Sequence, residues 1–397
     1  MTTGIGEFGS IVLRIDDKEI AVFKEYCFSN HFLTPTDGFR MVLGDEVLGP
    51  EFFDILIPGK TVQLLIDGKL QATGYLDVVD YTGDRMSGNT VVLEGRDVLS
   101  VVVDSEIDPR KRFPEKTPLD KLLKDTLLPF GFTTFSIDNE KNSSIAAGKF
   151  LKRPKKPSKS LPSYRLTQSK PHHNERYFEF VSRITQREGL WIWAGVDGKT
   201  LIVGKPDFDQ APRYQIRRKN GGATNNILSG GVRYDSVDQP SMIFATGNIP
   251  PTSYEHVVGH VLIVNPYWTS ETPTLLDEVK ETVEVKAKPV QLPNRFASLV
   301  ARPKFVKDTE SRTKDQLSRF AQRTLSLYVR RAVVGTYTFM GHELDGQVVQ
   351  VDTVVDVQDD RSNWHAPMWI LSRSLRKSRT GGTTTTIECL PLNSLVF

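Results

Sequence analysis

The stretch that most constrains the fold is residues 177–203, because its hydrophobic period changes halfway along. From Tyr177 to Ile184, apolar residues recur at helical spacing, i, i+4 and i+7. Gly189 follows the last polar turn, where the glycine that ends a helix would stand. The period then becomes two, as in a β-hairpin with strands at 190–193 and 200–203 and a turn at Asp197-Gly198. We therefore expect an amphipathic helix packed on a β-hairpin, a module without the shape of a catalytic motif.

The composition limits the class of protein. The chain has 397 residues, enough for two to four domains, and its 39% hydrophobic and 25% charged residues are typical of a soluble globular protein. Its net charge of +3 is too small to argue for nucleic acid. The two cysteines, Cys27 and Cys389, lie at opposite ends of the chain, which favours a reducing cytoplasm over a disulfide framework. Residues 1–10 lack the layout of a signal peptide, and no apolar run approaches the roughly 20 residues of a membrane span.

The first hundred residues read as short strands with turn signals between them. We expect two hairpins, at 11–22 and 62–76, and a further strand at 91–97 whose alternation continues through Leu99, Val101 and Val103. A polar stretch with Pro35 and Gly38 separates the first hairpin from the rest. Five or six short strands in about 100 residues suggest a small barrel or sandwich.

The character changes near Asp104. Thr117-Pro118 reads as a helix start, with Thr117 as N-cap and Pro118 at the first helical position, and leucines from 119 to 127 form the apolar face. Residues 141–170 then carry nine Lys or Arg, three prolines and no Asp or Glu, a composition that cannot bury a core. We expect an exposed loop here. It either touches an acidic neighbour or is a solvated insertion, and we favour the second.

The last part of the chain returns to strands. Arg217–Gly222 reads as a boundary, and residues 250–302 are irregular and punctuated by prolines. Residues 309–331 are the longest helix candidate, with Leu317, Phe320, Ala321, Leu325 and Tyr328 on one face. Strand signals occupy residues 226–232, 241–247, 333–339, 348–357, 368–373 and 383–390.

Three motifs that could carry chemistry are weak. Residues 4–9 fit G-x-G-x-x-G as text, but no strand precedes them and a strand follows, so a flexible arm is favoured over a nucleotide site. His256 and His260 have helical metal-ligand spacing, but Val257 stands where the metalloprotease motif needs Glu, and a strand here would separate the rings by roughly 13 Å. His172-His173 read as a loop before the helix.

The remaining candidates are structural. Asp359-Asp360 read as solvated turn residues. Trp191 and Trp193 lie two apart on one strand and face the same side, which favours a core or interface role over a ligand-stacking platform. The sequence shows no nucleophile elbow, no phosphate loop and no plausible pair of carboxylates for glycoside cleavage.

The order of elements resembles a known family. The motifs that carry the resemblance are, in chain order, residues 93–97 with 103–104, 187–191 with 197–201, and 344–346, 368–371 and 384–391. They resemble the baseplate hub (tail protein P) family of Mu-like contractile-tailed bacteriophages, which is related in fold to myophage hub proteins and secretion-system spike proteins. The stretches 141–170 and 250–302 are longer than the usual connections of that family.

The resemblance implies a mainly β fold with an α/β middle domain. It places a first barrel-like tube domain at 1–104, a middle domain with an inserted helix–hairpin module at 105–225, and a second barrel-like domain of similar fold at 226–397. It implies a homotrimer that adapts a hexameric tail tube to a trimeric spike in the virion baseplate, after assembly in the host cytoplasm. Other implied partners are further baseplate proteins, including the tape measure protein, and DNA passing through the lumen.

The resemblance implies no catalytic, cofactor-binding or metal-binding residues and no cofactor. Two other readings stay open. One is a tail-associated enzyme that degrades the cell wall, which would need a pair of acidic groups in a pocket. The other is a receptor- or glycan-binding tail protein, which would need Trp191 and Trp193 exposed.

Overall fold

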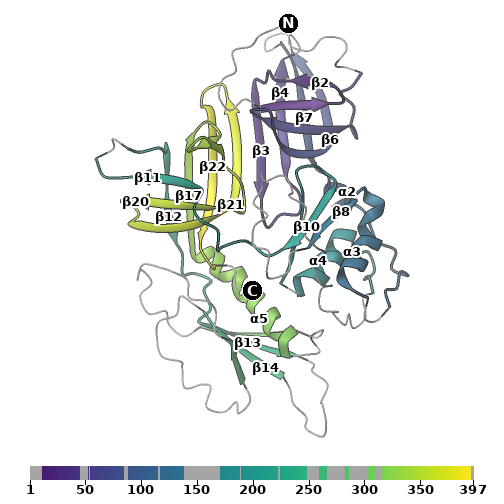
Figure 1. Ribbon diagram of the computed structural model, residues 1–397, viewed down its shortest axis with the longest axis vertical. Coiled ribbons are helices and arrows are strands. Elements are labelled where there is room, and N and C mark those ends of the chain that lie inside the picture. The colour runs from purple at the N-terminus through teal and green to yellow at the C-terminus, as the bar shows by residue number, and fades with distance from the viewer. Residues whose placement is uncertain are drawn as a thin grey trace.

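The fold, seen in a computed structural model, consists mostly of β-strands (Figure 1). The structure describes residues 11–44, 52, 54–84, 88–114, 117–137, 170–187, 189–221, 224–247, 259–265, 282–285, 302–308, 311 and 314–394. The glycine motif at 4–9, His256 and all but the last residue of the basic stretch 141–170 lie outside these ranges. A mainly β fold class is confirmed.

The described part of the first β-region contains seven strands: β1 (Ile11–Ile15), β2 (Lys18–Ile20), β3 (Glu25–His31), β4 (Gly38–Gly44), β5 (Thr61–Ile66), β6 (Lys69–Asp84) and β7 (Gly88–Asp97). Inward-facing residues alternate with outward-facing ones, and Leu13, Met41 and Leu93 are fully buried. Burying such a side chain stabilises the fold by roughly 1.5–3 kcal/mol. The predicted hairpin at 62–76 is present and turns at Asp67-Gly68, with both residues at positive φ (49° and 72°) as a type I′ hairpin needs.

Two sequence predictions for this region are wrong. The stretch taken as polar contains β3 and β4, whose buried residues alternate with polar ones. The alternation predicted beyond β7 ends instead in the helix α2 (Ser100–Asp104), which buries Val102. The Asp97 carboxylate accepts the Leu99 N–H at 3.0 Å, which bends the chain just before this helix.

The middle module has the predicted helix on a hairpin. It comprises α3 (Leu119–Leu127), the 3-10 turn η2 (Leu128–Phe130), β8 (Thr134–Ile137), α4 (Tyr177–Arg187), β9 (Trp191–Ala194) and β10 (Thr200–Gly204), and its sheet runs β8-β10-β9. Gly189 has φ +70° and donates to the Gln186 carbonyl, while Leu190 donates to Thr185, which completes a Schellman ending for α4. Thr117 is not the predicted cap, because its hydroxyl donates to the Pro114 carbonyl and α3 begins after Pro118.

The last β-region contains β11 (Tyr214–Arg218), β12 (Ser229–Tyr234), β17 (Val333–Met340), β18 (Glu343–Leu344), β19 (Gln347–Val348), β20 (Val354–Asp359), β21 (Trp364–Ser378) and β22 (Gly382–Pro391). β11 pairs with β20 of this region, although the sequence analysis assigned residues 105–225, which include β11, to the middle domain. Asp359 is fully buried, so the prediction of a solvated turn is wrong for it. Its carboxylate accepts the Tyr337 hydroxyl (3.2 Å) and the N–H groups of Arg361 and Ser362, and it pairs with Arg218 at 3.4 Å.

A separate four-stranded sheet is inserted between β12 and β17. Its strands are β13 (Met242–Gly247), β14 (Gly259–Val264), β15 (Thr282–Val285) and β16 (Pro303–Asp308), in the order β15-β14-β13-β16. The long helix α5 (Lys314–Ala332) packs on it through the predicted face, with Leu317, Ala321 and Leu325 fully buried. The stretch 250–302, predicted to be irregular, therefore contributes two strands to this sheet.

The two β-regions share one strand order. The first runs β3-β4-β7-β6-β5-β1, and the last runs β12-β17-β22-β21-β20-β11. Neighbouring strands are antiparallel throughout, except that β11 and β20 are parallel where β1 and β5 are antiparallel. Each order contains a long bulged hairpin, β6–β7 in one and β21–β22 in the other. Position by position, the inner strands of the two regions therefore correspond.

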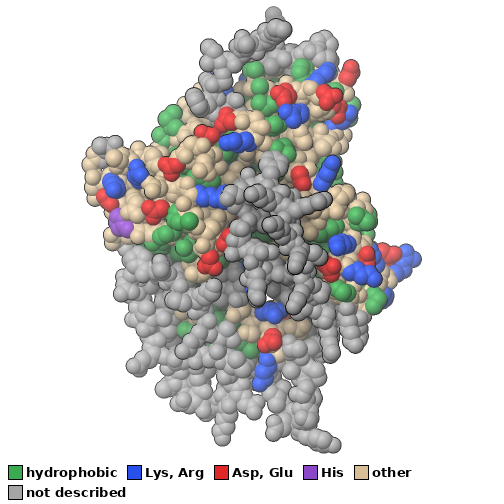
Figure 2. Space-filling model, viewed as in Figure 1, with side chains coloured by type: hydrophobic (Ala, Val, Ile, Leu, Met, Phe, Trp, Pro, Cys, Tyr) green, Lys and Arg blue, Asp and Glu red, His purple; other side chains and the backbone are tan. Residues whose placement is uncertain are grey.

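The described helices include none with the length and apolar character of a membrane span. Figure 2 shows acidic and basic side chains interspersed over the described part of one face, as expected from the small net charge.

Candidate functional site

One strand pair joins the two β-regions. β3 pairs antiparallel with β21, from His31 opposite Ser372 to Tyr26 opposite Lys377, and we call this pair the seam. The bulge between Ile370 and Ser372 lies where β21 leaves β20 and reaches β3. Both regions thus belong to one continuous sheet (Figure 1).

Arg373 occupies the centre of the seam and is only 3% exposed. Its Nε donates to Asn30 Oδ1 at 2.7 Å, and its Nη1 donates to Gln71 Oε1 at 3.1 Å and to the Val349 carbonyl. The guanidinium also lies 5.6 Å from the centroid of the Phe28 ring. Burial lowers the pKa of Arg373 to about 10, so the side chain stays charged at neutral pH. One cation therefore connects three segments from the two regions.

Asn30 links Arg373 to a pair of carboxyl groups. Its Nδ2 donates to Asp37 Oδ2 at 2.5 Å, and the Asp37 N–H donates to Asp97 Oδ2 at 3.2 Å. Burial raises the pKa of both carboxyls, and the charge of Asp37 raises that of Asp97 further. At Asp37, the Asn30 hydrogen bond and Arg373 oppose the rise. Such neighbouring groups titrate as one coupled unit rather than independently.

Asp37 and Asp97 form a pair of acidic groups of the kind that a cell-wall-degrading enzyme would need, and the sequence did not reveal this pair. Asp37 and Asp97 line a cavity of about 10 Å³, together with Phe28, Phe39 and other residues of the first region. That volume holds about one water molecule. A glycoside hydrolase places its two carboxyls on either side of a sugar ring, which this cavity cannot admit. The pair therefore belongs to the internal support of the seam.

His342 forms a second buried bridge to β3. Its Nε2 lies 2.8 Å from the Tyr26 hydroxyl, and its Nδ1 lies 2.8 Å from Thr385 Oγ1. Because Thr385 donates its own proton to the Gly341 carbonyl at 2.7 Å, it accepts from Nδ1–H, and Nε2 accepts from Tyr26. Burial, with a smaller effect from Arg373, lowers the pKa of His342 to about 4 and keeps this ring neutral.

The predicted tryptophan pair is partly buried and packs against the cluster of Phe32, Trp369, Leu371 and Leu390. Trp191 and Trp193 both meet the Phe32 ring, at centroid distances of 6.3 and 5.0 Å, so they do face one side of their strand. Phe32 in turn meets Trp369 of β21 at 5.1 Å in an edge-to-face contact. This cluster attaches the middle module next to the seam. The core or interface role favoured from the sequence therefore agrees with the packing.

The hairpin tip of the middle module docks on β6. The Thr73 hydroxyl donates to the Val196 carbonyl at 2.7 Å. Gly198 at the tip has φ +68°, and a Cβ atom there would lie 2.8 Å from the Thr73 methyl group. Glycine is therefore needed for both the turn and the close approach.

The histidines that the structure describes are not brought together as ligands. His260 lies in β14, while His172 and His173 precede α4. Residues 256–258, which the sequence also predicted to be a strand, lie outside the described residues. Across the described ranges, no three His, Cys, Asp or Glu side chains form a group that could hold a metal ion.

The seam itself escaped sequence reasoning. Leu371, Arg373 and Leu375 share one phase of β21 and are all buried, so an arginine stands at an inward position between two leucines. In β3, Asn30 likewise continues the buried phase of Tyr26 and Phe28. A polar residue at an inward-facing position of a strand was the one sequence signal that could have indicated this buried network.

Known proteins resemble this chain in one domain by sequence and over nearly its whole length by fold. Residues 10–97 match the family model described as Mu phage baseplate assembly protein GpP-like, N-terminal. No curated protein matches the chain in sequence. The tail protein from Neisseria meningitidis MC58 is 19% identical with a TM-score of 0.72, and 98% of each chain is covered.

Two further solved structures extend the likeness. The 43 kDa tail protein of prophage MuSo2 from Shewanella oneidensis is 15% identical with a TM-score of 0.69, covering 97% of this chain and 99% of that one. An E. coli type VI secretion component, described as similar to the T4 bacteriophage tail proteins gp27 and gp5, is 8% identical with a TM-score of 0.52, covering 96% and 76%. The recognition made from the sequence is confirmed: residues 10–97 match the N-terminal domain of the Mu phage GpP-like baseplate family, and the chain has the fold of phage tail proteins.

Proposed function

We propose that this chain is a structural hub protein of a contractile-tail baseplate. In this proposal three copies form a ring that adapts a hexameric tail tube to a trimeric spike and surrounds part of the channel for DNA. The GpP-like match over residues 10–97 and the tail-protein fold over nearly the whole chain support a baseplate role. The likeness to a secretion component compared with T4 tail proteins supports a place near the spike.

The observation that carries the proposal is the repeated strand order. A threefold assembly can meet a sixfold tube through near-equivalent contacts only if each chain presents two similar surfaces. The orders β3-β4-β7-β6-β5-β1 and β12-β17-β22-β21-β20-β11 supply such a pair. We propose the same division into regions 1–104, 105–225 and 226–397, with β11 counted in the last region because it pairs with β20. The middle module then lies outside the ring.

The seam suggests how the ring closes. Aligning the bulge at Leu76/Val78 with that at Ile370/Ser372 matches residues 78–83 of β6 with 372–377 of β21. The counterpart of β3 is β12. Since β21 pairs with β3 inside one chain, β6 would pair with β12 of the partner subunit. Three internal and three intersubunit joints would then alternate around the ring.

Exposure and charge agree with this joint. Leu375 of β21 is fully buried in the core of the first region, whereas its counterpart Tyr81 is 48% exposed and the nearby Val78 is 44% exposed. In the seam, Ser374 of β21 lies opposite Ser29 of β3. The counterpart of Ser374 is Asp80 and the counterpart of Ser29 is Arg233, so the joint would place Asp80 opposite Arg233 of the partner subunit. At the β12 edge, the Val232 N–H donates to Ser362 Oγ at 3.1 Å, a side-chain contact that an incoming strand would replace.

Charge reversal tests both the oligomer and the joint. We expect the wild-type chain to have the mass of a trimer in sedimentation or light scattering. Asp80→Arg or Arg233→Asp should each shift the mass toward the monomer, because like charges then face each other across the joint. The double variant should recover the trimer. Asp125→Arg, an exposed change on α3, is the matched control and should leave the mass unchanged.

Two results would remove the proposal. A stable hexamer of identical chains would leave no need for a repeated region. A wild-type chain that stays monomeric at every concentration would contradict the trimer. If the trimer forms but both single variants assemble normally, the hub role survives and the β6–β12 joint is wrong.

We also propose that the protein is not an enzyme, needs no cofactor and resides in the virion baseplate after assembly in the host cytoplasm. The acidic pair at Asp37 and Asp97 supports the lack of a glycan-cleaving activity, because its cavity of about 10 Å³ cannot take a glycan. A cell-wall hydrolysis assay and metal analysis of the purified protein test the point. Clear hydrolysis, or stoichiometric zinc, would contradict it.

A further inference from the structure

The two long hairpins, β6–β7 and β21–β22, end in the same kind of turn. Their last paired residues are Asp84 with Gly88 and Ser378 with Gly382, so the two turns have equal length. The glycine that closes each turn has positive φ, 73° at Gly88 and 65° at Gly382, a conformation that glycine adopts without strain. The alignment of the two bulges brings these turns into register.

The two hairpins match on the exposed side of the sheet rather than in the core. In this register the return strands β7 and β22 carry identical residues at two partly exposed, outward-facing positions, Thr90 with Thr384 and Glu94 with Glu388. The buried positions between them hold different residues, Val91 with Thr385 and Leu93 with Ile387. A core accepts the exchange of residues of similar volume. Exposed residues that are the same in two regions of one chain indicate one contact that is made twice.

An arginine follows the outgoing strand of both hairpins, Arg85 after Asp84 and Arg379 after Ser378. Arg85 lies outside the described residues. Arg379 is exposed, and its guanidinium forms no ion pair or hydrogen bond with any residue that the structure describes. Its charge is therefore open to an acidic group of a partner, and a charge-assisted hydrogen bond is among the strong ones.

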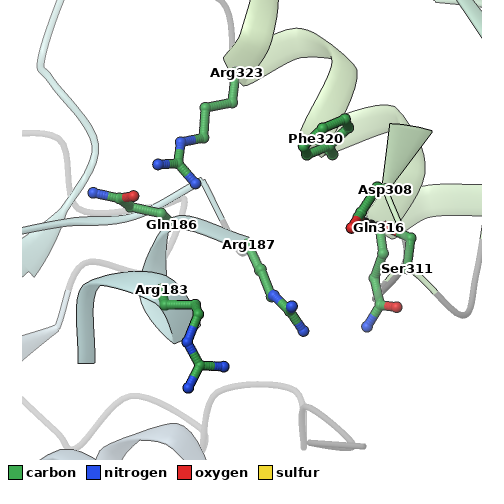
Figure 3. Close-up of a pocket in the computed structure, with 8 residues that line it drawn as sticks. All are labelled: Arg183, Gln186, Arg187, Asp308, Ser311, Gln316, Phe320 and Arg323. Atoms are coloured by element: carbon green, nitrogen blue, oxygen red, sulfur yellow. Dashed lines mark hydrogen bonds between the residues drawn. The ribbon is translucent and has the colours of Figure 1, made fainter. Parts of the chain in front are cut away.

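Both turns lie at the same edge of the continuous sheet. From β21 through β3, β4 and β7 to β6, each strand is antiparallel to the next, so β6 runs in the same sense as β21 and turns at the same edge. Figure 1 shows α5, β13 and β14 at the opposite end of the molecule from the β21–β22 turn. α4 and α5 face each other across a cavity of about 180 Å³ lined by Gln186 and Phe320 among others (Figure 3). The hairpin ends thus lie away from the inserted elements.

We propose that these two hairpin ends form the surface on which the hexameric tail tube docks, with one hairpin end on each tube subunit. This rests on the proposed hub function, in which three chains present six hairpin ends around one axis. The paired glycines and threonines at 88, 90, 382 and 384 make the repeated contact. Arg379 pairs with a carboxylate of the tube subunit that it meets. A sixfold partner fits because it offers the same surface to both hairpins of each chain.

Binding of the purified full-length trimer to the purified tail tube protein of the same phage, followed by interferometry, tests the contact. Thr90→Tyr and Thr384→Tyr place a bulky neutral side chain at matched positions, and tyrosine suits an exposed strand. Each should weaken binding by about tenfold or more, as changes at the centre of an interface do, and both by a similar factor. Thr133→Tyr, the same change at an exposed position of the middle module, is the matched control and should bind as the wild type does. All these variants should keep the mass of the wild-type trimer.

Arg379→Gln removes no contact with the described chain, so it tests the surface even if a tyrosine variant fails to assemble. It should weaken binding at low salt and make the affinity less sensitive to sodium chloride, because exposed charge pairs are screened by salt. Arg361→Gln, at the exposed turn before β21, is the control and should do neither.

The outcomes separate this inference from the hub role. A wild-type trimer that does not bind the tube protein would remove both. If the wild type binds and both tyrosine variants bind equally well, the hub role stands and the hairpin contact is wrong. A loss in only one of the two tyrosine variants would mean a threefold contact, and it would overturn the repeated docking surface in the same way.

Discussion

The long strands β6 and β21 begin alike and end in different surroundings. Up to its bulge, each pairs with the preceding strand of its own region, β5 or β20. Beyond the bulge, β21 runs onto β3 and buries Leu375, whereas the matching half of β6 leaves Val78 and Tyr81 44% and 48% exposed. The same strand order thus builds a finished joint in one place and an open edge in the other. Whether a joint or an open edge is formed therefore depends on the half of the strand that follows the bulge.

The finished joint carries a buried polar network. Arg373 is buried among the hydrogen bonds of the seam, and its counterpart on β6 is the partly buried Val79. A slip of β21 by one residue would turn Arg373 to the other face and break its contacts with Asn30 and Gln71. The network therefore fixes the register of a joint between segments more than 300 residues apart.

Replacing Arg373 is the largest expected break of this joint. Arg373→Met should cost about 3–5 kcal/mol, because it leaves Asn30, Gln71 and the Val349 carbonyl without their donor and the carboxyl pair without its cation. Chemical denaturation followed by tryptophan fluorescence measures the loss. Arg376→Met, at an exposed position of the same strand, is the control and should change stability little. Equal losses in the two variants would mean that the buried network does not hold the seam.

Leu375→Ala tests the apolar part of the seam. Leu375 is fully buried in the core of the first β-region, so truncation should cost about 2–5 kcal/mol through lost burial and the cavity left behind. The same denaturation experiment measures it. A loss below about 1 kcal/mol would show that β21 can relax away from β3 at this point.

The His342 bridge predicts a pH dependence. Its pKa is about 4 in the fold against 6.5 for an ordinary histidine, so the neutral ring is the folded form. It contributes stability above pH 6.5 that is lost as the pH falls from 6.5 to about 4. A shift of this size corresponds to about 3 kcal/mol. Measuring unfolding from pH 7 to pH 4 should show the wild type losing more stability than His342→Gln.

The comparison with His342→Gln is needed because other groups titrate with the opposite sign. The pKa values of Asp37 and Asp97 are raised in the fold, so these groups contribute stability at low pH that is lost as the pH rises. The difference between the two proteins isolates the histidine. Parallel curves for wild type and variant would refute a neutral, buried His342.

Local patterns predicted the local structure, and the long-range joint lay beyond them. Residues 177–203 and the face of α5 were readable because period and turn residues lie next to each other in the chain. β3 was missed because Asn30 interrupts its apolar phase, and that polar residue exists for a contact with Arg373, 343 positions away. Asp359 was misread for the same reason, since its partners Tyr337 and Arg218 come from other strands. Nothing local marks such pairings.

The attachment of the middle module gives a smaller effect. Gly198→Ala should destabilise by about 1–3 kcal/mol, because it strains a positive φ and drives a Cβ against Thr73. Gly341→Ala is the matched control, with φ +73° and nothing within 4 Å of the added atom. Its cost should be only that of the backbone. Thermal unfolding of the two variants separates clash from strain, and equal Tm losses would mean that the hairpin tip does not press on β6.

The smallest expected effect sharpens the comparison most. Tyr81 stands where Leu375 stands in the seam, yet it is 48% exposed in the single chain. Tyr81→Ala should therefore change the stability of the isolated chain by less than about 0.5 kcal/mol, as surface substitutions usually do. Denaturation at a concentration where the chain is monomeric measures this. A loss as large as that of Leu375→Ala would show that the second half of β6 is already packed within one chain, and the open edge would then offer no place for a partner subunit.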